Sequence, residues 1–79
     1  MKVRPAGSMM TLADSMERVV EIPDREALMV YLLDNFDFWE PTPENVTCKF
    51  YARDERIDWD THLICIDGKA ALFADGPIP

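Results

Sequence analysis

Only residues 24–35 carry apolar side chains at helical spacing. Asp24 is a good N-cap, Glu26 places negative charge in the first turn, and Asn35 suits the left-handed geometry that often ends a helix. At about 100° per residue, one arc of this helix holds the side chains expected to face the core: Leu28, Met29, Leu32, Leu33 and Phe36. The opposite side, which includes Val30 and Tyr31, is more apolar than solubility requires.

Other segments follow strand patterns. Residues 16–22 predict a first strand that ends at Pro23, and residues 46–53 alternate between apolar and polar side chains. Residues 59–66 and 69–74 predict two further strands. Before them, Thr11 and Asp14 have the spacing of a capping box, which indicates a single helical turn.

Asp67 and Gly68 predict a tight hairpin, because both central positions of a type I′ turn need positive φ. Counting outward from this turn predicts a first face with the pairs Ile66–Lys69, Ile64–Ala71 and His62–Phe73. The second face then holds the pairs Cys65–Ala70 and Leu63–Leu72. Because the second face is wholly apolar, we assign the helix to it and expect this buried set: Leu28, Leu32, Phe36, Phe50, Leu63 and Leu72.

Together these elements predict an α+β fold with the order β-α-β-β-β. The sheet is expected to be four-stranded and mostly antiparallel, with one helix packed on one face. Residues 1–10 are expected to be a flexible leader or a cloning remnant, and residues 11–79 a single domain. The leader lacks the apolar run of a signal peptide, which favours a cytoplasmic location with reduced cysteines.

The chain is acidic, with 15 Asp and Glu against 8 Lys and Arg. Two of the basic residues, Lys2 and Arg4, lie in the leader, so residues 11–79 have six bases, 15 acids and a net charge of −9. Such an excess opposes direct binding to nucleic acid or to an anionic membrane, because phosphate contacts need Lys and Arg. It favours a basic protein partner. The alternative is that the charge only keeps a small protein soluble.

No catalytic or metal site is expected. His62 is the only histidine, and it lies in mid-strand without a nucleophile among its expected neighbours. Cys48 and Cys65 fall opposite one another if Arg53 pairs with Asp60, which leaves open a thiol pair or two small buried side chains. The acidic segment 54–60 lacks the glycine and the terminal glutamate of a calcium loop. We therefore expect a protein that is not an enzyme and that uses no cofactor.

What remains is an acidic surface with aromatic residues. Residues 34–44 contain four acids and no base around Phe38 and Trp39, and residues 54–60 contain four acids around Trp59. Such groups can occupy basic channels where phosphates normally bind. The predicted partner-binding residues are Tyr31, Asp34, Asp37, Trp39, Glu40, Asp54, Glu55 and Asp58. The alternative for Phe38 and Trp39 is that they cap the core beneath a proline-rich loop.

The run from Asp54 to Ala70 (DERIDWDTHLICIDGKA), closed by Asp75-Gly76-Pro77, resembles small proteins of phages and mobile elements. Within residues 36–77, the chain is similar to anti-CRISPR inhibitors of type I Cascade complexes, type I-C included. The resemblance implies a non-catalytic inhibitor in the host cytoplasm that binds a Cascade subunit and blocks recognition of target DNA. It brings no catalytic residues.

A different class of function stays open beside this one. The chain could be a structural or regulatory module that acts through an apolar sheet face, as a monomer, a weak homodimer or a binder of another host protein. Salt dependence separates the two classes, because a charge-driven contact weakens as ionic strength rises.

Overall fold

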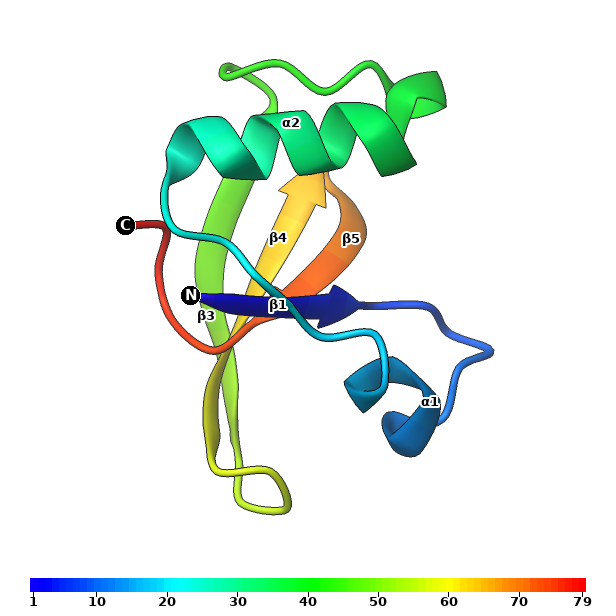
Figure 1. The fold of residues 1–79 in the computed structure, drawn as a ribbon, viewed down its shortest axis with the longest axis vertical. Helices are drawn as coiled ribbons and strands as arrows, with labels where there is room; N and C mark the ends of the chain where they lie inside the picture. The colour runs from blue at the N-terminus through cyan, green and yellow to red at the C-terminus, as the bar shows by residue number, and fades with distance from the viewer.

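The computed structural model describes residues 1–79 and has an α+β fold, as expected from the sequence (Figure 1). A five-stranded antiparallel sheet has the order β2-β1-β5-β4-β3. The elements are β1 (Lys2–Pro5), α1 (Leu12–Met16), β2 (Val20–Glu21), α2 (Arg25–Asn35), the 3₁₀ helix η1 (Asp37–Trp39), β3 (Val46–Asp54), β4 (Trp59–Ile66) and β5 (Lys69–Ala74). The helix α2 lies across one end of the sheet. No helix has the length and apolar character needed to span a bilayer.

The N-terminal segment corrects the expectation of a flexible leader. Strand β1 lies inside the sheet, between β5 and β2, and Val3 is fully buried between Ala74 and Val20. The terminal ammonium of Met1 also donates to the Ile22 carbonyl at 2.9 Å. Residues 2–5 were missed because four residues are too few to show an alternating pattern. The edge of β5 requires a partner strand, and β1 supplies it.

A first strand was expected over residues 16–22, but only Val20 and Glu21 form a strand, β2. Met16 belongs instead to α1, a single turn that begins as predicted, with the Asp14 amide donating to Thr11 Oγ1 at 3.1 Å. The observed fold therefore has five strands and two α-helices where four strands and one helix were expected.

Helix α2 has the expected cap, because the Ala27 amide donates to Asp24 Oδ1 at 2.9 Å. Leu28 and Leu32 are fully buried, as predicted. The buried arc is rotated relative to the prediction, since Leu33 is 51% exposed while Tyr31 packs against the core. The rotation leaves Leu33 on the outer surface, close in sequence to Asp34.

The hairpin between β4 and β5 has the predicted turn, with positive φ at Asp67 (51°) and Gly68 (75°). The pairs Ile66–Lys69 and Cys65–Ala70 also match. The register then shifts, because Ala71 is an extra residue on β5, and Ile64 pairs with Leu72. A bulge of this kind sends every later residue of β5 to the opposite face from the one expected.

The helix packs on the first face of the sheet, whereas the second face was predicted, and the bulge brings Leu72 onto that same first face. Ile64, Ile66 and Leu72 are fully buried in one cluster with Leu28 and Leu32 of α2. Leu63 was expected beneath the helix but is only half-buried, on the other face. Two more members of the predicted set differ: Phe36 is half-buried, and Phe50 is 59% exposed and stacks edge-on against His62 at 5.6 Å.

Candidate protein-binding surface

The first acidic group lies at the end of α2, on η1 and in the loop that follows. We call it the α2–η1 surface and define it by the exposed residues Asp34, Asp37, Glu40 and Glu44. None of the four carboxylates forms an ion pair, and the segment contains no basic residue. Asp34 also lies in the last turn of α2, which has no basic residue. The negative end of the helix dipole lies at this terminus, so a carboxylate there lowers the stability of the helix.

Hydrogen bonds to Asn45 hold the loop after η1. The Asn45 side chain accepts from the Thr42 amide at 2.7 Å and donates to the Glu40 carbonyl at 3.1 Å. Glu40 itself has left-handed φ and ψ (51° and 57°) and ends η1, and Pro41 is buried. These constraints fix the backbone that carries Asp37, Glu40 and Glu44 before any partner binds.

Three aromatic residues have different roles at this surface. Phe38 is 73% exposed and packs edge-on against Trp39, with ring centroids 5.6 Å apart. Phe36 and Trp39 pack against the core, and the Lys69 ammonium lies 5.4 Å from the centre of the Trp39 ring. The expected anchor Trp39 is therefore largely used within the fold, and the ring that protrudes is Phe38.

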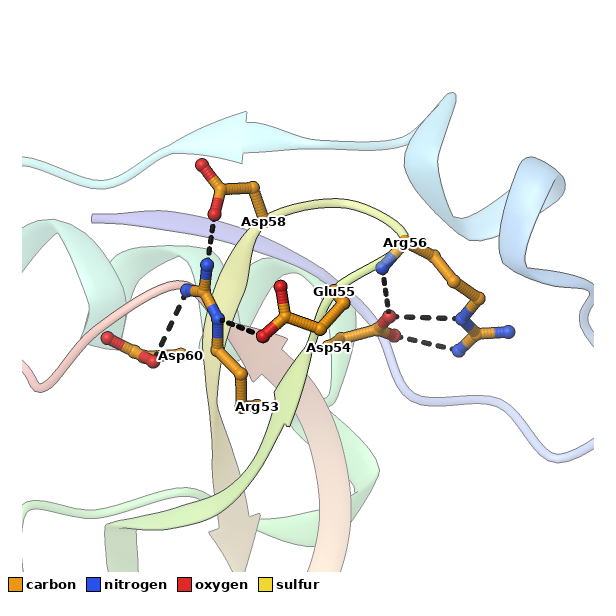
Figure 2. A network of polar contacts seen from close by, with 6 residues as sticks. All are labelled: Arg53, Asp54, Glu55, Arg56, Asp58 and Asp60. Atoms are coloured by element: carbon orange, nitrogen blue, oxygen red, sulfur yellow. Dashed lines mark hydrogen bonds and ion pairs between the residues drawn. The ribbon is translucent and has the colours of Figure 1, made fainter.

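The second acidic group lies at the turn between β3 and β4, and Figure 2 shows that its carboxylates are paired within the protein. Arg53 Nε and Nη1 donate to Glu55 at 3.2 Å and to Asp60 at 3.3 Å, and Arg53 Nη2 bonds to Asp58. We call this group, with the arginines, the hairpin-tip cluster: Arg53, Asp54, Glu55, Arg56, Asp58 and Asp60.

Arg56 pairs with the fourth carboxylate of the hairpin-tip cluster. Its guanidinium contacts both oxygens of Asp54, at 3.0 and 2.7 Å, and its backbone amide donates to Oδ1 at 3.0 Å. The hydrogen bonds from Arg56 lower the pKa of Asp54. The hydrogen bond from Asp54 raises the pKa of Arg56, and hydrogen bonds with Glu55 and Asp58 raise that of Arg53.

The two acidic groups differ in net charge and lie at opposite ends of the molecule. The α2–η1 surface has four carboxylates and no base, whereas the hairpin-tip cluster has four carboxylates, two arginines and a net charge of −2. In Figure 1, α2 and η1 lie at the top and the β3–β4 turn at the bottom of the longest axis, which is 32 Å. The structure thus separates Asp34, Asp37 and Glu40 from Asp54, Glu55 and Asp58.

Tyr31, another predicted anchor, lies on α2 one turn before Asp34. It is half-buried and lines a pocket of about 490 Å³ together with Val20, Asn35 and Phe36. This pocket lies between α2 and the segment that leads into β2. The Asn35 side chain donates to the Tyr31 carbonyl at 2.9 Å.

The cysteines and the histidine lie apart from one another. Arg53 does pair with Asp60, but a bulge at Tyr51 shifts the register, so Cys48 lies opposite Ile64 and not opposite Cys65. The two thiols are free, and burial raises the pKa of Cys48. His62 Nδ1 lies 2.7 Å from the Asp60 carbonyl. No group of three or more His, Cys, Asp or Glu side chains is arranged to hold a metal ion.

Arg4 is a buried charged residue that the sequence did not reveal. It was assigned to the leader, yet it is 4% exposed and lines a second, larger pocket with α1 and the hairpin tip. The only sequence signal was the alternation of Lys2, Val3 and Arg4, which is too short to predict a strand. Comparisons of the chain with protein-family models, with curated proteins and with solved structures gave no match.

Proposed function

We propose that this protein is a non-catalytic, protein-binding inhibitor whose α2–η1 surface docks on a basic, nucleic-acid-binding surface of its partner. One observation carries the proposal: four exposed carboxylates without a base lie on a braced segment around the exposed ring of Phe38. In this proposal the carboxylates take positions that nucleic-acid phosphates normally occupy, and Phe38 fills an apolar site among them.

Two physical effects support this surface over the rest of the molecule. The electrostatic field of an unpaired carboxylate is not cancelled by a neighbouring cation. Such carboxylates therefore attract a basic partner over a distance and can then form ion pairs with its lysines and arginines. The carboxylates of the hairpin tip already bond to Arg53 and Arg56, and a partner would have to compete with those bonds. Asp34 also supports this surface. Its charge opposes the dipole of α2 and destabilises the helix, and no ion pair within the protein offsets that loss.

The partner in this proposal is a protein that holds nucleic acid through lysine-rich or arginine-rich surfaces. The resemblance of residues 36–77 to anti-CRISPR proteins makes a type I Cascade complex the specific partner to test, with block of target-DNA recognition as the effect. A cytoplasmic site of action belongs to the same proposal.

The test uses two isosteric variants that change the net charge equally. The first carries Asp34→Asn, Asp37→Asn and Glu40→Gln; the control carries Asp54→Asn, Glu55→Gln and Asp58→Asn. Both go from −7 to −4, so only the position of the lost charge differs. Binding to a type I Cascade and restoration of its DNA binding are then measured, after circular dichroism shows that both are folded.

We expect the α2–η1 variant to lose affinity by about tenfold or more and the hairpin-tip variant to lose much less. Affinity of the parent should also fall as salt rises, and this dependence should weaken in the first variant only. Equal losses from both variants would indicate an effect of overall charge. Full inhibition by the α2–η1 variant would refute the proposed surface.

A second candidate is self-association through β3, favoured by the exposed edge of the sheet. Strand β3 is nine residues long, has no neighbour on its outer side, and exposes Phe50 and Tyr51. The first face of the sheet, which contains Ile64 and Ile66, is not available for this contact. Both residues are buried in the core with the α2 residues Leu28 and Leu32. Sedimentation of the parent and of Phe50→Glu at micromolar concentration tests it: a dimer that Phe50→Glu dissociates supports this candidate, and a monomeric parent rejects it.

A further inference from the structure

A pocket of about 620 Å³ lies beside Arg4. Its walls come from β1 and the segment after it, from α1, from β5 and from the β3–β4 hairpin, so it forms where the N-terminal segment meets the hairpin. Arg4 and Val3 are adjacent on β1 and therefore face opposite sides of the sheet, with Val3 in the core. Pockets of this volume accept small organic molecules.

Arg4 is a buried cation without an acidic partner. Its guanidinium lies 4.7 Å from the ring centre of Phe73 and 5.1 Å from that of Trp59. Nη1 donates to Ser15 Oγ at 2.9 Å, and Ser15 in turn donates to the Pro5 carbonyl at 2.8 Å. No carboxylate forms an ion pair with Arg4. Burial lowers its pKa, and the charge of Asp54 partly opposes that shift.

Two buried polar atoms have no hydrogen-bond partner within the protein, Arg4 Nε and Thr61 Oγ1. Both residues are only 4% exposed, and both line this pocket. Burial of an unpaired donor on a charged group costs free energy, so native proteins usually satisfy such a group with water, an ion or a ligand. Because Nη1 is engaged with Ser15, the free edge of the guanidinium is the one that contains Nε, an edge that can bind both oxygens of a carboxylate.

The remaining walls restrict the class of anion. Met10, Leu12 and Phe73 supply apolar surface, and the exposed ring of Tyr51 lies 5.9 Å from that of Phe73. The charged side chains that line the pocket sum to +1: Arg4, Arg53, Arg56, Asp54 and Glu55. Because Arg53 and Arg56 pair with the two carboxylates, Arg4 is the lining cation left for a ligand, and one negative charge balances the pocket. An anion with one charge and an apolar body satisfies both conditions.

We propose that this pocket binds a small monocarboxylate with an apolar body, its carboxylate held by Arg4 and Thr61 and its body lying against Tyr51 and Phe73. The site is separate from the α2–η1 surface and goes beyond the function proposed above. A ligand bound there would contact both the N-terminal segment and the β3–β4 hairpin, because both line the pocket.

The first experiment titrates the ¹⁵N-labelled full chain with phenylacetate, with its neutral isostere phenylacetamide and with inorganic phosphate. We expect phenylacetate at millimolar concentration to shift the amide signals of Ser15, Thr61 and Phe73. The amide should bind about tenfold more weakly, because it lacks the charge that Arg4 pairs with. Phosphate should not compete with phenylacetate.

Two variants locate the carboxylate. Thr61→Val keeps the shape of the side chain, breaks no hydrogen bond of the fold and should weaken phenylacetate binding by about threefold to tenfold. Arg4→Lys keeps the charge, loses the planar fork and should weaken it further, whereas the exposed control Arg25→Lys should not. Should Arg4→Lys fail to fold, Thr61→Val still decides. Absence of shifts with phenylacetate, equal binding of phenylacetamide, or unchanged binding by Thr61→Val would each overturn the proposal.

Discussion

The two acidic groups of this protein have the same number of carboxylates but differ in whether those carboxylates form ion pairs within the protein. At the hairpin tip, Arg53 contacts Glu55, Asp58 and Asp60, and Arg56 contacts Asp54, so every carboxylate is paired within the turn. On the α2–η1 surface, Asp34, Asp37, Glu40 and Glu44 face solvent without a cation. Local composition is the same for a turn whose charges pair with one another and for a surface whose charges are unpaired. The two are distinguished by whether the carboxylates form ion pairs within the protein.

The sheet holds the two acidic groups apart, and the largest predicted effect concerns the core of that sheet. Ile64→Ala should lower the free energy of unfolding by about 2–4 kcal/mol, because Ile64 is fully buried beneath α2. Leu63→Ala should cost clearly less, since Leu63 is half-buried on the other face. Urea denaturation of both variants measures the difference, and equal losses would contradict the observed register.

A smaller effect concerns the helix that carries Asp34. Asp24→Ala removes the acceptor for the Ala27 amide and should cost about 1 kcal/mol of stability. Asp24→Ser is the matched control, since serine caps helices equally well without the charge. If thermal or urea unfolding showed equal destabilisation by both variants, the charge of Asp24 and not its cap would be what matters.

Removal of the cation at the hairpin tip should make the two acidic groups behave alike. Arg53→Gln frees three carboxylates, so the tip should begin to bind an oligolysine peptide as the α2–η1 surface is proposed to do. Arg25→Gln is the control, because it changes the net charge equally while Arg25 pairs with no carboxylate. Backbone amide shifts on titration are the measurement. A tip that stays silent in Arg53→Gln would show that pairing is not what suppresses binding.

The smallest predicted effect is the titration of Asp54. Its pKa is lowered by hydrogen bonds from Arg56, so these bonds stabilise the fold above the unfolded-state pKa, and the contribution is lost as the pH falls through the lower, folded-state pKa. In Arg56→Gln, the midpoint of the Asp54 carboxyl signal, followed by ¹³C NMR, should move upward. An unchanged midpoint would mean that Arg56 does not hold the carboxylate in solution.

Local signals in the sequence predicted local structure correctly. The cap at Asp24, the short turn at Thr11 and the Asp67-Gly68 hairpin are all present, because each depends on residues within a few positions. The helix was assigned to the wrong face, because β4 has apolar side chains on both of its faces. The register was also wrong in part, because bulges at Tyr51 and Ala71 shift it without any sequence mark. Strand β1 was missed because its pairing with β5 joins the two ends of the chain.

The acidic residues were identified from the sequence, but their pairing was not. Arg53 precedes the acidic run and Arg56 lies inside it, and only the hairpin geometry brings three carboxylates to one guanidinium (Figure 2). Trp39 and Tyr31 were named as anchors for their apolar character, whereas packing leaves Phe38 exposed instead. Exposure of a large side chain depends on the helix rotation and on loop packing, which no local pattern encodes.

The most direct test of the central claim is to map where a basic ligand contacts the unmodified protein. The ¹⁵N-labelled chain is titrated with an oligolysine peptide at low salt, and amide shifts are followed residue by residue. We predict shifts over residues 34–44, including Phe38, that disappear at high salt, with residues 53–60 unaffected. Shifts confined to residues 53–60, or equal at both ends of the molecule, would contradict it.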